Sequence, residues 1–305
     1  MSSRVRINEV VTRDGFQSEP RFIPTEDKIA LVDLMSRAGY HAIEVTSFTS
    51  PKAIPMLADA EAVMAGITRN PAVEYVALIP NVRGAERALK ANVDAFNLVM
   101  SVSESHNRAN LRMSRDESCT QLADVIRLAH DAGTPVNVSL STSFGCPFEG
   151  AVNPEAVLEW AGRFSDLGVR GVSLCDTTGM ADPGSVSRLC HDARDRFPGL
   201  ALTLHFHNTR GMGLANALAA LQAGIREFDA SLGGLGGCPY APGATGNICT
   251  EELVHMLQLM GYDTGMDLSL LLEGAARVES LAGRQVPSQL LRAGPAGSPR
   301  ASSCA

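Results

Sequence analysis

The sequence has no uninterrupted apolar run that approaches the ~20 residues of a membrane-spanning helix. Its first residues, Met1–Arg4, lead directly into a strand-like segment, without the charged and then apolar stretches of a secretory signal. These two absences predict a protein that has no membrane partner and that is not secreted.

The chain also lacks a basic patch or stripe, which a nucleic-acid-binding protein needs for its contacts with phosphates. The formal net charge is −7, and the Lys and Arg residues are scattered along the chain. This pattern excludes nucleic acid as a partner. An acidic protein that binds an anionic substrate has to do so through local positive groups.

No C-x-x-C pair and no compact, even framework occurs among the seven cysteines. Scattered cysteines indicate reduced thiols instead of disulfides or a zinc ribbon, and reduced thiols are typical of a cytoplasmic protein. The chain has 305 residues, of which 45% are hydrophobic, so it can bury a large core without covalent links. We therefore expect a soluble, cytoplasmic protein.

Short apolar runs alternate with amphipathic stretches along the whole chain. The runs predict eight β-strands, at Val5–Val11, His41–Thr46, Glu74–Ile79, Ala95–Met100, Pro135–Ser141, Gly171–Cys175, Ala201–Phe206 and Glu227–Ser231. The amphipathic stretches predict helices at Glu26–Ala38, Met56–Gly66, Arg83–Asn92, Arg115–Ala132, Pro154–Leu167, Pro183–Phe197, Leu214–Ala223 and Glu251–Met260. Thr25 and Asp182 stand at the cap positions of two of these helices.

Strands that alternate with helices pair in parallel through right-handed crossovers, and eight such repeats favour a closed barrel. The predicted fold is an α/β (β/α)₈ TIM barrel with an additional C-terminal helical segment at Leu268–Leu281. A doubly wound open sheet is the alternative, but no G-x-G-x-x-G motif opens the chain after a strand. Residues 1–292 are expected to form one domain, and the small, polar, proline-rich tail of residues 293–305 is expected to be disordered.

Polar side chains recur where the predicted strands end, at the rim that carries catalytic residues in TIM barrels. They are Arg13, Asp14, Glu44, Asp176, Thr177, His205 and His207, followed after the eighth strand by the glycine-rich stretch Gly233–Asn247. These residues are distant in sequence, and the fold would bring them together at one mouth of the barrel.

His205 and His207 are the sharpest chemical signal, because residues i and i+2 of a strand face the same side. Both imidazoles would point into the mouth, where Asp14 would add an oxygen from the opposite wall. Two nitrogens and one carboxylate with open positions suit a fairly hard, octahedral cation such as Mg²⁺ or Mn²⁺. Zinc or iron is compatible with the same ligand types, and two packed histidines without a metal are the alternative.

Arg13 places a permanent cation beside the Asp14 carboxylate, where it would stabilise an enolate oxygen that forms when a carbon–carbon bond breaks. An ordinary Arg–Asp pair in a surface turn is the alternative. The glycine-rich stretch carries Cys238, and it is either a mobile lid that brings a thiol acid or a flexible connection.

Several motifs together resemble the 3-hydroxy-3-methylglutaryl-CoA lyase family, which is part of the wider DRE-TIM metallolyase group. The motifs are Arg13–Glu19, Ile43–Lys52, Gly145–Gly150, Asp176–Thr177, His205-x-His207 and Gly233–Asn247. They follow one another in the family's order, and the resemblance runs from about Val5 to Arg284.

The resemblance implies a metal-dependent lyase that cleaves a 3-hydroxyacyl-CoA thioester to acetyl-CoA and a keto acid. The implied ligands of Mg²⁺ or Mn²⁺ are Asp14, His205, His207 and Asn247. The implied catalytic residues are Arg13 for the enolate, Cys238 for proton transfer, and Glu44 and Asp176 in the polar shell. Substrate contacts are expected from Gln17, Thr177, Ser139 and Asn137. The family also implies a homodimer or a higher homo-oligomer.

The chain departs from the family pattern at four positions. Pro20 stands where the family usually has a lysine, with Arg21 one place later, and Ser139 stands where it has a tyrosine. Asn208 replaces an aspartate, and Arg210 replaces an aromatic residue. Because these changes concern the substrate pocket more than the metal, we hypothesise that the reaction is retained on an acyl group with a larger or differently charged C3 substituent.

Two other functions share some of these features. An isopropylmalate-synthase-type enzyme would condense acetyl-CoA with a keto acid on the same barrel, but the Gly-Gly-Cys-Pro loop favours the lyase branch. A metal- or CoA-binding barrel without catalysis would not be expected to keep the whole ligand set. A turnover assay combined with a metal assay separates these functions.

Overall fold

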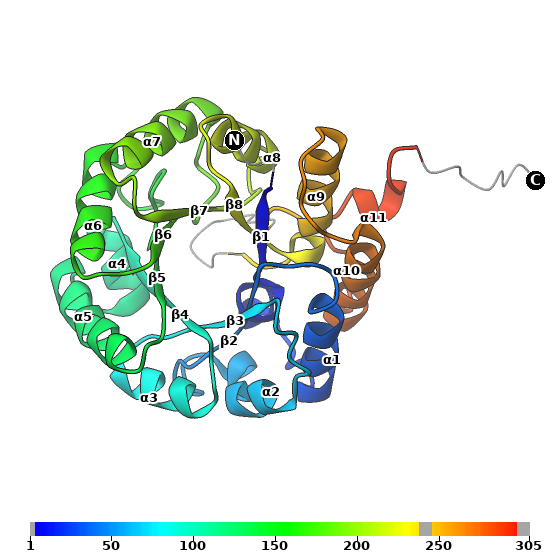
Figure 1. The fold of residues 1–305 in the computed structure, drawn as a ribbon, viewed down its shortest axis with the longest axis horizontal. Coiled ribbons are helices and arrows are strands. Elements are labelled where there is room, and N and C mark those ends of the chain that lie inside the picture. The colour runs from blue at the N-terminus through cyan, green and yellow to red at the C-terminus, as the bar shows by residue number, and fades with distance from the viewer. Residues whose placement is uncertain (1–3, 238–245, 298–305) are drawn as a thin grey trace, which may run out of the picture.

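Eight parallel strands close into a barrel in which consecutive strands pair and β8 pairs with β1 (Figure 1). The computed structural model describes residues 4–237 and 246–297. The strands are β1 Arg6–Glu9, β2 Ala42–Ser47, β3 Glu74–Leu78, β4 Ala95–Ser101, β5 Val136–Ser141, β6 Gly171–Asp176, β7 Ala201–Phe206 and β8 Glu227–Ala230. The predicted (β/α)₈ barrel is confirmed, and the bounds of each strand lie within two residues of the predicted ones.

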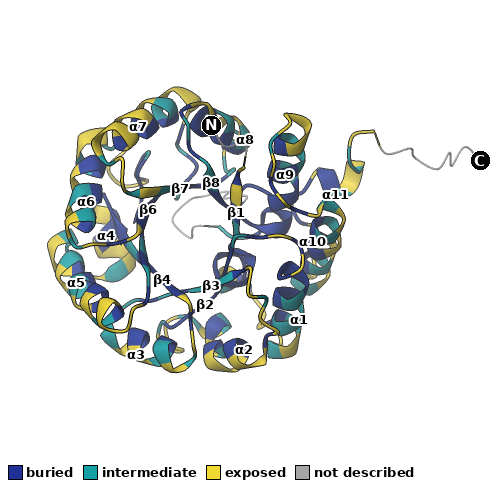
Figure 2. Ribbon diagram, viewed as in Figure 1, coloured by how far each residue is buried: buried dark blue, intermediate teal, exposed yellow. Residues whose placement is uncertain are grey.

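Helices surround the barrel, with their outer faces exposed and their inner faces buried (Figure 2). Those between the strands are α1 Thr25–Met35, α2 Ala60–Gly66, α3 Val82–Lys90, α4 Glu104–Leu111, α5 Arg115–Asp131, α6 Pro154–Asp166, α7 Pro183–Arg196 and α8 Gly213–Gln222. After β8 follow α9 Thr250–Leu259, α10 Leu268–Ala282 and α11 Leu290–Ala293. Every predicted helix is present, including the additional C-terminal one, whereas the sequence pattern does not predict α4 and α11.

Local interactions decide where the helices begin. Asp182 accepts hydrogen bonds from two backbone N–H groups at the start of α7, as its position predicts. The prediction that Thr25 caps α1 is wrong, because Pro24 occupies the cap position and the Thr25 hydroxyl donates to Asp59 instead. Buried Lys28 of α1 forms an ion pair with the same aspartate. Because Asp59 directly precedes α2, this ion pair links α1 to the start of α2.

The apolar core lies between the strands and the helices, where side chains such as Phe164 and Leu204 are completely buried. The interior of the barrel is more polar than this core. It holds a cavity of about 210 Å³ whose lining includes Asn8, Asn97 and Thr203. Bulky branched side chains fill this space in most TIM barrels. The polar lining reaches the rim of the barrel and supplies hydrogen-bonding groups to the site described below.

The C-terminal helix α10 packs against α1 and α9 on the outside of the barrel (Figure 1). Of the tail for which disorder is predicted, Ala293 lies in α11, and residues 298–305 lie outside the described residues. The single domain at residues 1–292 stays a prediction. Across the described ranges, each helix is too short or too polar to span a bilayer.

Candidate metal centre

The turn after β1 carries Arg13 and Asp14. Val11–Gly15 forms a π-helical turn, in which the backbone N–H groups of residues 13, 14 and 15 all donate to the carbonyl oxygen of Val10. Such single π-helical turns are rare and occur often at functional sites. The turn ends β1 earlier than the apolar pattern predicts, and it buries both side chains beside Glu44 of β2 and His207, the residue after β7.

His205 lies in β7 and His207 directly follows the strand, and their rings meet as the i, i+2 spacing predicts. Their Nε2 atoms lie 3.2 Å apart. One ligand atom from each histidine and one from Asp14 all lie within 4.8 Å of one another, and the three residues are buried. The structure thus confirms that two imidazoles and one carboxylate form a single cluster.

Asn247, the fourth predicted ligand, lies against this cluster. Its Nδ2 donates to Asp14 Oδ2 (2.6 Å) and to the carbonyl oxygen of Leu235 (3.0 Å). Its buried Oδ1 has no hydrogen-bond partner in the described part of the chain. An unpaired amide oxygen beside a carboxylate and two imidazoles is a donor set for a hard divalent cation, so these residues fit the predicted metal ion.

The surroundings of Asp14 and His207 favour the protonation states in which these two residues bind cations. Burial raises the pKa of Asp14, but the positive charges of Arg13 and the two histidines outweigh burial and lower it to about 2. Burial and the charge of His205 lower the pKa of His207 to about 4. An ionised carboxylate and a neutral imidazole are the forms that coordinate metals.

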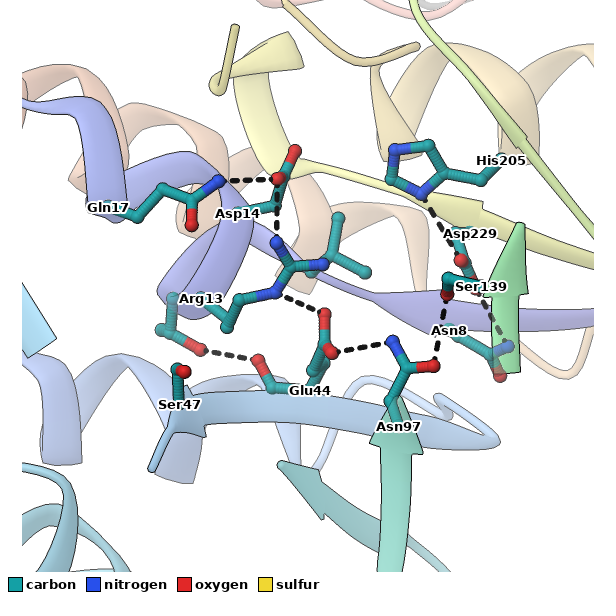
Figure 3. Close-up of polar contacts among 12 residues, drawn as sticks. Asn8, Arg13, Asp14, Gln17, Glu44, Ser47, Asn97, Ser139, His205 and Asp229 are labelled. Atoms are coloured by element: carbon teal, nitrogen blue, oxygen red, sulfur yellow. Dashed lines mark hydrogen bonds and ion pairs between the residues drawn. The ribbon is translucent and has the colours of Figure 1, made fainter. Parts of the chain in front are cut away.

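Arg13 connects the cluster to a chain of hydrogen bonds across the mouth of the barrel (Figure 3). Its Nη1 donates to Asp14 Oδ1 (2.8 Å), and its Nε donates to Glu44 Oε2 (2.6 Å). The other oxygen of Glu44 accepts from Asn97 Nδ2 (2.8 Å). Both carboxylate oxygens of Glu44 are therefore engaged, and this side chain orients the guanidinium of Arg13.

Asp229 of β8 is a site residue that sequence reasoning missed. Its Oδ2 lies 3.2 Å from His205 Nδ1, and its Oδ1 accepts from Asn8 Nδ2 (3.0 Å) (Figure 3). Such a carboxylate fixes the tautomer of the imidazole and leaves Nε2 free for a metal. Burial lowers the pKa of His205, but Asp229 and Asp14 outweigh it and raise the pKa above its ordinary value.

Asn97 of β4 is the second site residue that the sequence analysis did not predict. Two predicted substrate-binding residues donate hydrogen bonds to its side chain. Ser139 Oγ and Asn137 Nδ2 both donate to Asn97 Oδ1, each at 3.0 Å, and Asn137 Nδ2 also donates to Ser173 Oγ. Asn97 and Asp229 both lie inside predicted strands, and the alternation of inward-facing side chains is the signal that could have found them. Short polar groups therefore form the wall at the position of the family's tyrosine.

The other two predicted substrate-binding residues have different surroundings. Gln17 Nε2 donates to Asp14 Oδ1 (2.9 Å), so Gln17 joins the metal cluster. Thr177 Oγ1 accepts from the backbone N–H of Thr142 (3.0 Å) and stabilises the end of β5. Of these two side chains, only that of Gln17 forms a hydrogen bond with a residue of the metal cluster.

Asp176 ends β6 and shapes the loop that follows. Its Oδ1 accepts from the backbone N–H groups of Met180 (2.7 Å) and Ala181 (3.1 Å). Its Oδ2 is buried and lacks a partner among the residues that the structure describes. Burial raises the pKa of Asp176 to about 6. The preceding residue, Cys175 of β6, lies opposite His205 of β7 in the strand register. The sequence analysis did not predict Cys175 as a site residue.

Of the four positions that depart from the family pattern, Ser139 lies in β5, and Pro20, Asn208 and Arg210 lie in loops that follow strands. Asn208 Oδ1 accepts from the first backbone N–H of α8, and Arg210 donates to two carbonyl oxygens of the loop after β6 at 2.9 Å each. Pro20 is exposed. Cys238, the predicted thiol acid, lies outside the described residues.

Comparison with known proteins agrees with this geometry. The sequence profile of the HMGL-like family matches residues 4–278. The hydroxymethylglutaryl-CoA lyase YngG of Bacillus subtilis is 45% identical over 95% of this chain and 97% of its own length. The (R)-citramalyl-CoA lyase of Chloroflexus aurantiacus is 40% identical over 95% of each chain.

Solved structures show the same relationship. An HMG-CoA lyase from Acinetobacter baumannii, in complex with coenzyme A and 3-methylmalate, is 45% identical, with a TM-score of 0.94 over 98% of each chain. The HMG-CoA lyase of Bacillus subtilis is also 45% identical, with a TM-score of 0.93 over 96% of this chain and 99% of that chain. With the barrel, the cluster at its rim and a profile match over most of its length, the chain belongs to the HMGL-like family of carbon–carbon lyases.

Proposed function

We propose that this enzyme cleaves the C2–C3 bond of 3-hydroxy-3-methylglutaryl-CoA, or of a close 3-hydroxyacyl-CoA analogue, to acetyl-CoA and a keto acid. The observation that carries the proposal is the cluster of Asp14, His205 and His207 with the Arg13 guanidinium bonded to the same aspartate. Relatives at 40–45% identity carry the corresponding lyase names. The resemblance of the motifs and the placement of their side chains therefore support one reaction.

We assign Asp14, His205, His207 and Asn247 as ligands of Mg²⁺ or Mn²⁺. When bound, the cation supplies a Lewis acid that lowers the pKa of the substrate's 3-hydroxyl group. The carboxylate of Asp176 keeps one oxygen without a donor among the described residues, and we assign it to accept the hydroxyl proton. The C2–C3 bond then breaks, its electron pair moves to the thioester as an enolate, and C3 becomes the carbonyl carbon of the keto acid.

Arg13 is assigned to the developing enolate oxygen. Glu44 and Asp14 hold its guanidinium from two sides, so the positive charge is oriented before the reaction begins. Cys238 is proposed to protonate the enolate at C2, on the strength of the sequence motif, because it lies outside the described residues. That proton transfer releases acetyl-CoA.

Two acyl groups are candidates for the substrate. Gln17, Thr177, Ser139 and Asn137 are proposed to contact it, and the polar wall at Ser139 favours a C3 substituent that forms hydrogen bonds. The Chloroflexus aurantiacus relative is named as a (R)-citramalyl-CoA lyase, which makes citramalyl-CoA the specific second candidate. Both substrates would use the same metal cluster and the same Arg13.

The test measures acetyl-CoA release from both thioesters with Mn²⁺ or Mg²⁺, then with excess chelator, and then after the metal is restored. Metal-dependent release from either substrate supports the lyase, and the ratio of the two kcat/KM values identifies the acyl group. His207→Ala is expected to abolish release, whereas His191→Ala on the exposed face of α7 is the matched control and should leave it unchanged. A variant without His207 that keeps full metal-dependent turnover would contradict the assignment.

We also propose that the enzyme is a cytoplasmic homodimer or higher homo-oligomer, as the family resemblance implies. Light scattering coupled to size-exclusion chromatography tests the assembly state. A monomeric mass at working concentration with full turnover would exclude an obligate assembly.

A further inference from the structure

Glu9, the last residue of β1, is completely buried and accepts five hydrogen bonds. Its Oε1 accepts from three backbone N–H groups, those of Val10 (3.1 Å), Val11 (2.9 Å) and Leu232 (3.0 Å). Its Oε2 accepts from two hydroxyl groups, those of Tyr40 (2.6 Å) and Thr250 (2.8 Å). The mechanism proposed above does not use this carboxylate.

The backbone donors belong to the turn that carries Asp14 and to a segment that is hydrogen-bonded to Asn247. Val10 and Val11 begin the π-helical turn, and the Val10 carbonyl oxygen accepts all three backbone bonds that position Arg13 and Asp14. Leu232 begins the segment after β8, and the carbonyl oxygen of Leu235 in that segment accepts from Asn247 Nδ2. One oxygen atom of Glu9 therefore joins the Asp14 turn to the segment that holds Asn247.

We propose that Glu9 is a positioning residue, whose Oε1 sets the spacing between the turn that carries Asp14 and the Leu232–Leu235 segment that holds Asn247. This inference rests on the proposed metal site for its effect on the cation, but its effect on the two backbone segments is independent of any metal. None of the five hydrogen bonds of Glu9 comes from a proposed metal ligand.

The donors show why a carboxyl or amide oxygen is needed at this position. The N–H groups of Val11 and Leu232 have no second acceptor in the described part of the chain, whereas Val10 N–H also donates to the carbonyl oxygen of Ala230. Without Oε1, two buried N–H groups would be left unpaired, and the segments would move to pair them. A glutamine keeps Oε1, and its amide group can donate to the two hydroxyls, which are able to accept.

The experiment compares Glu9→Met with Glu9→Gln, two substitutions of similar length that differ in the acceptor. Mn²⁺ affinity is measured by calorimetry at about pH 8, because burial raises the pKa of Glu9 to about 7 against the effect of its donors. We expect Glu9→Met to weaken Mn²⁺ binding by about tenfold or more, the range in which indirect metal-site residues act, and Glu9→Gln to bind almost as the parent does. Hydrogen exchange in the metal-free protein should rise in residues 10–15 and 231–237 for Glu9→Met only.

The matched control is Lys28→Met, which removes another buried charge, at a position where its partners are Asp59 and the Met56 carbonyl oxygen. It should lower the unfolding temperature without changing Mn²⁺ affinity or exchange in the two segments. If Glu9→Met does not fold, Glu9→Asp, whose shorter side chain withdraws the acceptor, is expected to show the same two effects.

Equal metal affinity and equal exchange in the parent and in a folded Glu9 variant without the acceptor would overturn the inference. A parent protein that binds no Mn²⁺ would instead contradict the proposed metal site, and the exchange measurement would still test Glu9. The two failures are therefore distinguishable.

Discussion

Asp14 Oδ2 accepts a 2.6 Å hydrogen bond from Asn247 Nδ2, although 233 residues separate the two in sequence. Gly236 lies directly against this contact. A Cβ atom at position 236 would lie 2.7 Å from Asn247 Nδ2 and 3.0 Å from Asp14 Oδ2, which is too close for either atom to stay in place. The absence of a side chain at this position is therefore part of the geometry of the proposed metal ligands.

The first prediction follows from this contact. Gly236→Ala is expected to weaken Mn²⁺ binding by roughly tenfold or more, because Asp14 and Asn247 have to move apart from the new methyl group. Calorimetric titration measures the affinity. Gly133→Ala is the matched control, because Gly133 also has a positive φ of 68° but a Cβ there would meet nothing within 4 Å. Both variants should lose ~1 kcal/mol or more of stability to backbone strain, and only the first should lose metal affinity.

The second prediction concerns the carboxylate behind His205. Asp229→Ala should weaken Mn²⁺ binding about 10- to 100-fold, because His205 Nδ1 loses the acceptor that fixes its ring and its tautomer. Asp263→Ala removes an exposed aspartate that is paired with Arg4 and should leave the affinity unchanged. Equal affinities in the two variants would mean that Asp229 does not orient the histidine.

The third prediction separates metal binding from catalysis. Arg13→Lys is expected to lower kcat for acetyl-CoA release roughly 10²- to 10³-fold, because an ammonium group lacks the planar fork that lets the guanidinium bond Glu44 and Asp14 through separate nitrogens and still face the enolate oxygen. The KM value should change only a few-fold, since the enolate charge develops in the transition state. The control is Arg127→Lys, at an exposed pair with Asp124 on α5. A normal kcat in Arg13→Lys would remove Arg13 from the mechanism.

The fourth prediction concerns stability and pH. Glu251 of α9 is buried beneath the segment after β8, where it accepts from the backbone N–H of Gly233, and burial raises its pKa from 4.5 to about 7. A raised pKa in the folded state means that stability is fully present below about pH 4.5 and is lost as the pH rises through about 7. Glu251→Gln cannot ionise, so it should escape this loss.

Urea unfolding at several pH values between 5 and 8 measures the effect. The stability of Glu251→Gln relative to the parent should increase with pH by up to about 3 kcal/mol, which corresponds to the shift in pKa. Parallel stability curves for the two proteins would show that Glu251 does not titrate in this range. Glu117→Gln at an exposed helix start provides the control for the substitution itself.

The sequence by itself determined the eight strands, most of the helices and the two histidines of the metal cluster, because these features depend on short-range periodicity. Alternating apolar runs and amphipathic stretches are enough to predict the eight strands and the helices between them. The approach of His205 to His207 follows from the two-residue repeat of a strand alone. The motif order then places Asp14 and Arg13 at the same rim, which the closed barrel confirms.

The tertiary structure alone decided which other side chains support these residues. Asp229, Asn97 and Glu9 lie inside strands, where a polar residue in an apolar pattern does not reveal its partner. Their partners come from strands or turns far away in sequence, and only barrel closure sets those distances. The π-helical turn after β1 is also joined to Leu232 through Glu9 Oε1, and this contact between distant parts of the sequence is formed only in the folded barrel.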